Sequence, residues 1–224
     1  SHTPRPYWKS ASLTPYARPP MDPSALVFAA MRRLAPLSER ETRAIAPLLR
    51  PYSVPEGGWL LRAGERAEHS YFVLEGLVRE LYVSEDGTEH TRVFVPEGQV
   101  TGSLLDLLSG EPSVTHIQAL EPTSGLYLRY RALEALSATE PGIERLLRRS
   151  AEALYLRKAR REHAMLALSA AQRYQQWLGE HPELDARVSR RHLASYLGVT
   201  PEHLSRLARA RRSGPRAAGR RGSS

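Results

Sequence analysis

The residues whose types and spacing suggest a specific chemistry lie between positions 188 and 207. This stretch reads VSRRHLASYLGVTPEHLSRL, with apolar residues at helical spacing on both sides of Gly198. Gly198 suits the left-handed conformation that ends a first helix, while Thr200 can cap a second helix whose first residue is Pro201. This pattern predicts a helix-turn-helix, a motif whose second helix lies in the major groove of DNA.

Outward-facing positions of the predicted second helix carry groups that can recognise base edges. Glu202 and Arg206 are four residues apart and therefore share one face of the helix. Arginine can donate to O6 and N7 of guanine, and glutamate can accept a hydrogen bond from N4 of cytosine. We expect Glu202, Ser205 and Arg206 to read bases. The alternative is an ordinary surface helix with one Glu–Arg ion pair.

A second group of residues is expected to bind the phosphates of DNA, which position a protein without specifying a sequence. Its members are Arg190, Arg191, Thr200, His203 and Arg209. Residues 1–130 carry 13 Lys and Arg against 15 Asp and Glu, whereas residues 131–224 carry 19 against 9. The C-terminal part therefore has a net charge of +10, which favours a polyanionic partner.

The elements that must position these residues follow from the periodicity of the chain. Residues 23–35 and 38–50 predict two helices, the second opened by a capping box of Ser38 and Glu41. From Pro51 to Tyr130, short apolar runs alternate with glycine-containing turns, which is typical of β-strands. The runs are 59–62, 70–74, 77–83, 91–95, 114–120 and 125–129.

Two features indicate that these strands form a roll. The pair Asp86-Gly87 lies between two of the runs and is typical of a β-hairpin. The sequence Val-Pro-Glu-Gly occurs at residues 54–57 and again at 95–98, which suits a roll of two related halves. We predict an α+β fold whose N-terminal part is an antiparallel β-roll, similar to a jelly roll, of about eight strands.

A long helix is predicted from Pro141 or Gly142 to about Leu168. Its residues Ile143, Leu147, Ser150 and Leu154 recur at alternating spacings of four and three, the pattern of a seam between two helices of a dimer. The alternative is an amphipathic helix that packs on its own domain. Three short helices, at 170–178, 190–196 and 201–212, are expected to follow it.

These elements divide the chain into five parts. Residues 1–20 are rich in Pro, Ser and Thr and are interpreted as a disordered arm or a remnant of expression. The three structured parts are the roll at 21–140, the dimerisation helix at 141–168 and the helix-turn-helix domain at 169–212. The last part, 213–224, is interpreted as a basic disordered tail.

The composition excludes several classes of protein. The chain has no cysteine, which excludes disulfides, thiolate-bound zinc or iron–sulfur clusters and a cysteine nucleophile. Its eight histidines show no metal-ligand spacing, and no motif of a nucleotide-dependent enzyme or a serine hydrolase is present. No apolar run is long enough to span a membrane. We therefore expect a cytoplasmic protein that is not an enzyme and needs no metal or other cofactor.

The predicted roll, the long helix and the sequence VTPEHLSR at 199–206 together resemble the Crp/Fnr family of bacterial transcription regulators, over residues 25–212. The resemblance implies a cyclic-nucleotide-binding-type roll, a dimerising central helix and a C-terminal winged helix. Glu202, Ser205 and Arg206 resemble the Fnr-type reading head, which implies TTGA-type half-sites in a palindrome. Pro201 replaces the Arg of Crp-type heads, which disfavours a TGTGA half-site. Residues 182–188 are too few for the usual wing, so we expect it to be absent or trimmed.

The resemblance also implies where a cyclic nucleotide would bind, at residues 101–119. Members of the family that bind one carry Gly-Glu-Leu, whose Glu holds the ribose 2′-hydroxyl, and then Arg-Ser/Thr-Ala, whose Arg neutralises the phosphate. This chain has Gly102-Ser103-Leu104 and Ser113-Val114-Thr115 instead. Because an unpaired buried anion is strongly unfavourable, we expect a degenerate effector pocket that does not bind cAMP or cGMP. Leucines are expected to fill or cover it: Leu104, Leu105, Leu107 and Leu108.

These observations predict a homodimeric regulator of transcription that acts on a palindromic operator independently of cAMP. Its expected partners are double-stranded DNA and a second copy of the chain, with RNA polymerase as a further candidate and no membrane. One alternative is a regulator gated by cAMP or another small ligand in the roll. The other is a sensory or scaffolding roll whose basic tail binds nucleic acid without sequence preference.

Overall fold

The computed structural model describes residues 22–212, so the predicted arm at 1–20 and the predicted tail at 213–224 lie outside the described residues. Its first elements are α1 (Pro23–Leu34), α2 (Glu39–Ile45) and the 3-10 turn η2 (Ala46–Leu48). The predicted capping box is confirmed, because the Glu41 carboxylate accepts the Ser38 N–H at 2.7 Å and the Glu41 N–H donates to Ser38 Oγ at 3.3 Å. The second Glu41 oxygen accepts the Gly142 N–H at 2.6 Å, which ties α2 to the start of the long helix.

Eight strands follow within the described part of the chain: β1 (Arg50–Val54), β2 (Trp59–Leu61), β3 (His69–Glu75), β4 (Val78–Val83), β5 (Glu89–Val95), β6 (Val100–Thr101), β7 (His116–Ala119) and β8 (Thr123–Arg129). They form two antiparallel sheets, one ordered β1-β8-β3-β6 and the other β2-β7-β4-β5. The predicted α+β fold with an antiparallel roll is thereby confirmed. Strand β5 is an edge strand of its sheet.

The turns of the roll form where the sequence placed them. Residues 84–88, which include Asp86-Gly87, join β4 to β5 in a hairpin. The repeated Val-Pro-Glu-Gly segments end β1 and β5, and Gly57 and Gly98 both have positive φ, at +75° and +76°. Both glycine N–H groups also donate to a neighbouring strand, to Ala119 and to Val73 respectively. The repeat therefore makes the same kind of turn in each sheet.

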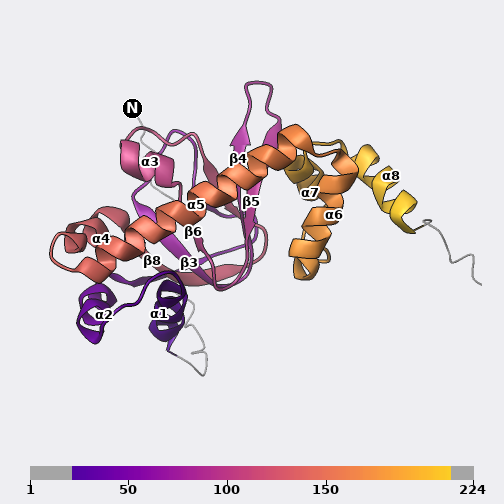
Figure 1. Ribbon diagram of the computed structural model, residues 1–224. Helices are drawn as coiled ribbons and strands as arrows, with labels where there is room; N and C mark the ends of the chain where they lie inside the picture. The colour runs from indigo at the N-terminus through magenta and orange to yellow at the C-terminus, as the bar shows by residue number, and fades with distance from the viewer. Residues whose placement is uncertain (1–21, 213–224) are drawn as a thin grey trace, which may run out of the picture.

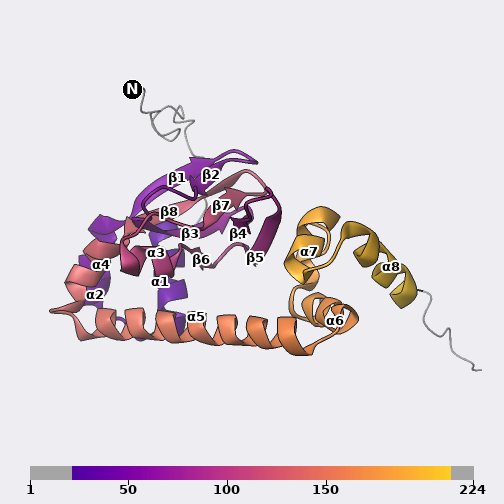
Figure 2. The same cartoon turned by 90° about the horizontal axis from the view of Figure 1, so that it is seen from above.

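Helices cover one side of the roll and extend beyond its end (Figures 1 and 2). They are α3 (Leu104–Ser109), α4 (Tyr130–Ser137), α5 (Pro141–Ala167), α6 (Ala170–Glu180), the 3-10 turn η3 (Pro182–Leu184), α7 (Arg190–Leu197) and α8 (Pro201–Arg212). The predicted long helix is α5, which crosses the roll and carries α6, α7 and α8 past its end. Between α6 and α7 the chain forms η3 and no strand, so no wing hairpin separates these two helices.

The first residues expected at a dimer seam lie on the side of α5 that faces the roll. Ile143 is fully buried and Leu147 packs against the same cluster, whose other members come from α1, α2, α4 and β8. Ser150 donates its hydroxyl to the Leu146 carbonyl at 2.8 Å, and Leu154 is half-buried. The prediction that Ile143 contacts a second chain is therefore wrong, because the same chain buries it fully, whereas the seam role of the partly buried Leu147, Ser150 and Leu154 stays a prediction.

The opposite side of α5 is exposed and carries large apolar residues. Tyr155, Leu156 and Leu166 are 71%, 51% and 82% exposed. Tyr155 and Leu166 lie on one stripe of the helix, on the far side from Ile143, and Leu156 lies about 100° around the helix from Tyr155. One face of α5 thus packs on its own domain, and the opposite face is exposed.

Candidate nucleic-acid interface

The helix-turn-helix forms from α7 and α8, as its local sequence predicts. Ser189 Oγ accepts the His192 N–H at 3.2 Å at the start of α7, and Gly198 ends this helix with φ +67°. Thr200 Oγ1 then accepts the His203 N–H at 3.2 Å at the start of α8. Leu193, Leu197 and Leu204 are buried between the helices. The second helix is therefore held by an apolar core, which leaves its other face to solvent.

The exposed face of α8 carries the predicted base-reading residues. Glu202, Ser205, Arg206 and Arg209 are all exposed and lie on one side of the helix. The Ser205 hydroxyl donates to the Pro201 carbonyl at 2.9 Å and keeps its lone pairs for an incoming donor. The backbone N–H of Glu202 and the Thr200 hydroxyl, together with Arg206, hold the pKa of the Glu202 carboxyl below its usual value. At neutral pH this face therefore presents an ionised acceptor beside a cationic donor.

The residues predicted to bind phosphates come from α7, α8 and the turn between them, and one of them, Arg191, lines a hollow together with Glu89 of β5. Arg190 and Arg191 are exposed in the first turn of α7, Thr200 is exposed before α8, and His203 is half-buried. Arg190 Nη1 donates to the Tyr174 hydroxyl at 3.2 Å and lies 3.5 Å from Asp185 Oδ1. These contacts hold Arg190 against α6 while it stays accessible to solvent.

The expected effector pocket is closed by its own polar groups. Ser103 and Ser113 are buried, Gly102 and Leu104 are half-buried, and Val114 is exposed. The Ser113 hydroxyl donates to Asp106 Oδ2 at 2.5 Å, and the Ser103 and Thr115 hydroxyl oxygens are 3.1 Å apart. Asp106 is only 3% exposed. A buried carboxylate thus contacts the position where the resemblance would require an arginine.

Two of the leucines expected to fill or cover this pocket are exposed. Leu105 and Leu108 are 54% and 52% exposed, whereas Leu107 is buried. Leu105 and Leu108 therefore do not fill the pocket. The segment forms the short helix α3, whose inward face consists of Asp106 and Leu107, so the two flanking leucines face solvent.

Sequence reasoning missed a polar network inside the roll. The Glu80 carboxylate accepts the Thr101 hydroxyl at 2.8 Å and lies 3.5 Å from Arg92 Nη1, and Arg92 donates to Thr115 Oγ1 at 3.3 Å. Arg92 also lies over the Tyr82 ring, 4.6 Å from its centroid. The charged pair Arg79-Glu80 inside the run 77–83 was the available signal. The network satisfies the polar groups near Ser103 without a ligand.

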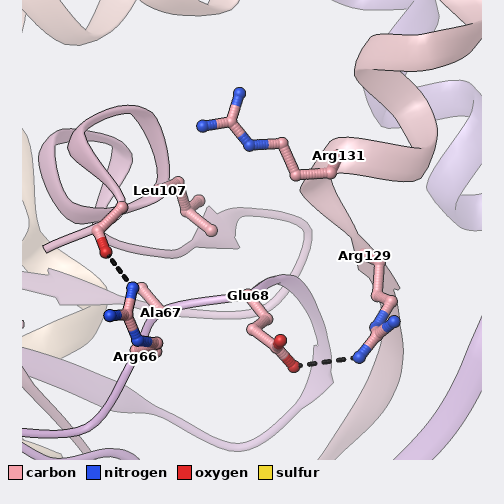
Figure 3. A pocket seen from close by; sticks show the side chains of 7 residues that line it. Arg66, Ala67, Glu68, Leu107, Arg129 and Arg131 are labelled. Atoms are coloured by element: carbon pink, nitrogen blue, oxygen red, sulfur yellow. Dashed lines mark hydrogen bonds and ion pairs between the residues drawn. The ribbon is translucent and has the colours of Figure 1, made fainter. Parts of the chain in front are cut away.

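A hollow on the surface of the roll lies outside this network (Figure 3). It holds about 220 Å³ and is lined by Arg66, Ala67, Glu68, Leu107, Gly110, Arg129 and Arg131. Arg129 pairs with Glu68 at 3.1 Å, and Arg66 donates to the Gly110 carbonyl. The hollow is smaller than the roughly 300–1,000 Å³ of ordinary ligand sites, and none of the five predicted pocket residues lines it.

Residues 22–212 contain no cluster of three His, Asp or Glu side chains close enough together to hold a metal ion. Within the same range, every helix is too short or too polar to cross a membrane.

Comparison with known proteins gives three kinds of match. Residues 52–140 match the model of the cyclic nucleotide-binding domain. The fumarate and nitrate reduction regulatory protein of Vibrio cholerae is 25% identical over 183 residues, 76% of this chain and 72% of that protein.

Solved structures resemble the chain in fold. FixK2 from Bradyrhizobium japonicum aligns with a TM-score of 0.65 and 24% identity, over 77% of this chain and 90% of the other. A putative Crp/Fnr-family transcriptional regulator from Eubacterium rectale aligns with a TM-score of 0.63 and 15% identity, over 80% and 85% of the two chains.

The fold and the interface define a class of protein. A β-roll of the cyclic nucleotide-binding type, joined by a long helix to a helix-turn-helix, is the architecture of DNA-binding transcription regulators, which are not enzymes. The chain resembles the Crp/Fnr family of these regulators in the type of its roll, in its sequence and in its fold.

Proposed function

We propose that this regulator acts in the cytoplasm as a homodimer and reads a palindromic operator with TTGA-type half-sites, without cAMP. The observation that carries the proposal is the exposed face of α8, where Glu202, Ser205 and Arg206 project together. In the major groove, Arg206 would donate to a guanine and Glu202 would accept from a cytosine. Arg190, Arg191, Thr200, His203 and Arg209 would hold the flanking phosphates.

The outward face of α5 supports the homodimer. Tyr155, Leu156 and Leu166 expose apolar surface along the helix that joins the roll to the reading helices. A second copy placed by a twofold axis would cover this stripe with the same stripe, as isologous dimers do. The two α8 helices would then meet successive major grooves, about 34–36 Å apart along the duplex.

The buried Asp106 supports independence from cAMP. A cyclic phosphate bound near Ser113 would meet this carboxylate, which is already hydrogen-bonded and 3% exposed, instead of an arginine. Two anions at one buried site repel each other, and displacing the Ser113 hydroxyl would leave Asp106 without that donor. The pocket region is better suited to stay filled by its own side chains than to open for a nucleotide.

Selection of bound duplexes from a random DNA library, with and without cAMP at one fixed salt concentration, tests the proposal. We expect a TTGA-type palindrome to be enriched equally in both arms. Enrichment only with cAMP would overturn the independence from nucleotide. Enrichment of single half-sites would overturn the dimeric mode of reading.

The same assay distinguishes sequence-specific reading from the alternative in which the basic tail binds nucleic acid without sequence preference. A chain lacking residues 213–224 should select the same palindrome as the full chain. Loss of all DNA binding in this truncated chain would favour binding through the basic tail instead. Because a regulator at an operator acts on transcription, we also propose RNA polymerase as a partner, which operator-dependent transcription in vitro would test.

A further inference from the structure

The helix-turn-helix is docked against the edge of the roll. The Ser195 hydroxyl, on α7, donates to the Glu89 carbonyl at 2.6 Å and accepts the Thr91 N–H at 2.9 Å. Glu89 and Thr91 belong to β5, whose outer edge pairs with no other strand among residues 22–212. One side chain of the DNA-binding domain thus satisfies both a donor and an acceptor of the exposed strand edge.

Arg161 strengthens this joint from the long helix. Its guanidinium donates to the Tyr196 carbonyl at the end of α7 and approaches the Thr91 carbonyl at 3.5 Å. It also lies over the Tyr196 ring, 4.0 Å from its centroid, and that ring packs against Phe94 of β5 at 5.4 Å. A single arginine therefore contacts the helix-turn-helix and the roll while belonging to the helix that connects them.

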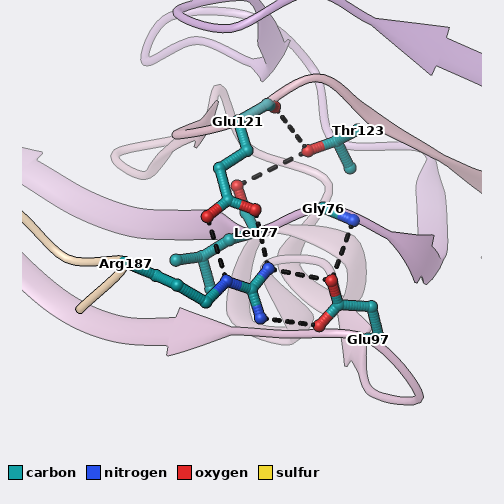
Figure 4. Close-up of polar contacts among 6 residues, drawn as sticks. All are labelled: Gly76, Leu77, Glu97, Glu121, Thr123 and Arg187. Carbon is teal, nitrogen blue, oxygen red and sulfur yellow. Dashed lines mark hydrogen bonds and ion pairs between the residues drawn. The ribbon is translucent and has the colours of Figure 1, made fainter. Parts of the chain in front are cut away.

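Arg187 forms a second attachment, before α7 begins (Figure 4). It makes two hydrogen bonds to Glu97, at 2.8 and 2.9 Å, and two to Glu121, at 2.7 and 2.9 Å. Both carboxylates lie in turns of the roll, one after β5 and one between β7 and β8. Paired hydrogen bonds of this kind fix direction as well as distance.

Apolar packing connects the two attachments. Leu77 and Phe94 of the roll belong to the same buried cluster as Trp177, Leu193 and Leu204 of the DNA-binding domain. Contacts at Ser195, Arg161 and Arg187, with a shared apolar cluster between them, leave the domain little freedom to pivot on the roll. Its orientation is held by side chains that lie away from the exposed face of α8.

We propose that this docking sets the distance between the two half-sites that the dimer reads, with Arg161, Ser195 and Arg187 as positioning residues. The inference rests on the proposed dimeric reading of a palindrome. Adding one base pair between half-sites moves the second site by about 3.4 Å and rotates it by about 34° around the duplex. A domain fixed to the roll cannot follow both changes, whereas a released domain can.

The test uses the full-length protein and duplexes that carry the selected half-sites at the preferred spacing, at one base pair more and at one fewer. A single half-site and a scrambled duplex complete the set. We expect the wild-type protein to lose about tenfold or more in affinity when the spacing changes, because contacts of one half-site are lost. We call the affinity at the preferred spacing divided by the affinity at the altered spacing the spacing ratio. In Ser195→Ala, Arg161→Gln and Arg187→Ala, the spacing ratio should fall to about threefold or less.

Two readouts separate positioning from a general loss of structure. Affinity for the single half-site should be unchanged in all three variants, and Ser195→Ala, which removes one oxygen atom, is the least disruptive to folding. The matched control is Arg160→Gln, which removes the same charge at the exposed neighbour of Arg161 and should keep the wild-type ratio.

The outcomes distinguish this inference from the proposed function. Variants that keep the wild-type spacing ratio would overturn the inference and leave the dimeric reader intact. Equal weakening on every duplex, including the single half-site, would also overturn it, because the residues would then only stabilise the fold. A wild-type protein that binds the palindrome no better than a single half-site would overturn the proposed function itself.

Discussion

In the proposed mode of reading, Arg206 is the side chain on which base recognition chiefly depends. We expect Arg206→Ala to remove about 1–3 kcal/mol of discrimination between the operator and a scrambled duplex, because a bidentate contact to guanine is lost. Fluorescence anisotropy with both duplexes at one salt concentration measures this ratio. Arg209→Ala is the control: loss of a phosphate contact should weaken binding to both duplexes alike and lower the salt slope by about one. An unchanged ratio in Arg206→Ala would remove this residue from base reading.

Ser113 stands where the resemblance implies a phosphate-binding arginine, and it makes a contact within the fold instead. Its hydroxyl donates to the buried Asp106 carboxylate at 2.5 Å. We expect Ser113→Ala to lower the free energy of unfolding by about 1–3 kcal/mol, since a buried acceptor loses its donor. Urea denaturation measures the change, and Ser53→Ala on an exposed strand position should stay within about 0.5 kcal/mol of the wild type. Equal stability of the two variants would contradict a supporting role for Ser113.

Among single residues, the sequence revealed the absence of the arginine and glutamate that hold a cyclic nucleotide. It did not reveal what replaces them. Asp106 and Leu107 point inward and Leu105 and Leu108 outward because α3 presents one face to the roll. A helix of six residues is too short for its periodicity to identify that face in advance.

The long helix α5 has one face packed on its own domain and one exposed face, which we propose as the dimer contact. Leu166→Glu places a charge on the outward stripe, 82% exposed in the single chain, so it should weaken association while the fold persists. Sedimentation velocity at micromolar concentration should show a shift from dimer to monomer, with the helical circular-dichroism signal retained. Leu105→Glu, which charges an exposed leucine outside α5, should leave association unchanged. A dimeric Leu166→Glu protein would argue against this face.

For the elements, local signals predicted most boundaries. The capping box at Ser38, Gly198 with the Thr200 cap, and the hairpin at Asp86-Gly87 all form as expected. Each depends on a few neighbouring residues, so no distant contact can easily change it. The seam prediction failed at Ile143, because the spacing of apolar residues does not show which surface will cover them.

The attachment of the DNA-binding domain to the roll is a property of the whole molecule, and it should respond to pH. Hydrogen bonds from Arg187 hold the pKa of Glu97 below its usual value of 4.5. A carboxyl whose pKa is lower when folded stabilises the fold above its unfolded pKa, and this contribution disappears as the pH falls through the folded value. We therefore expect the wild-type protein to melt at a higher temperature than Glu97→Gln at pH 7, with the gap shrinking below pH 4.5.

Thermal melting of both proteins across this pH range checks the expectation. Glu111→Gln, in an exposed loop, is the matched control and should follow the wild type at every pH. A gap between the wild type and Glu97→Gln that is the same at pH 7 and well below 4.5 would show that the ion pair does not contribute.

Local sequence was sufficient for the long helix, the helix-turn-helix, most turns and the strands' general location, because periodicity, caps and turn residues act within a few positions of the chain, but it did not predict α3 or α4. The docking of Ser195 on β5 and the contacts of Arg187 with Glu97 and Glu121 could not be read in this way. These residues are separated by 66 to 106 positions, and nothing in their own neighbourhoods marks them as partners. Which surfaces meet depends on the packing of all the elements together, and that packing decides how the reading helix is held.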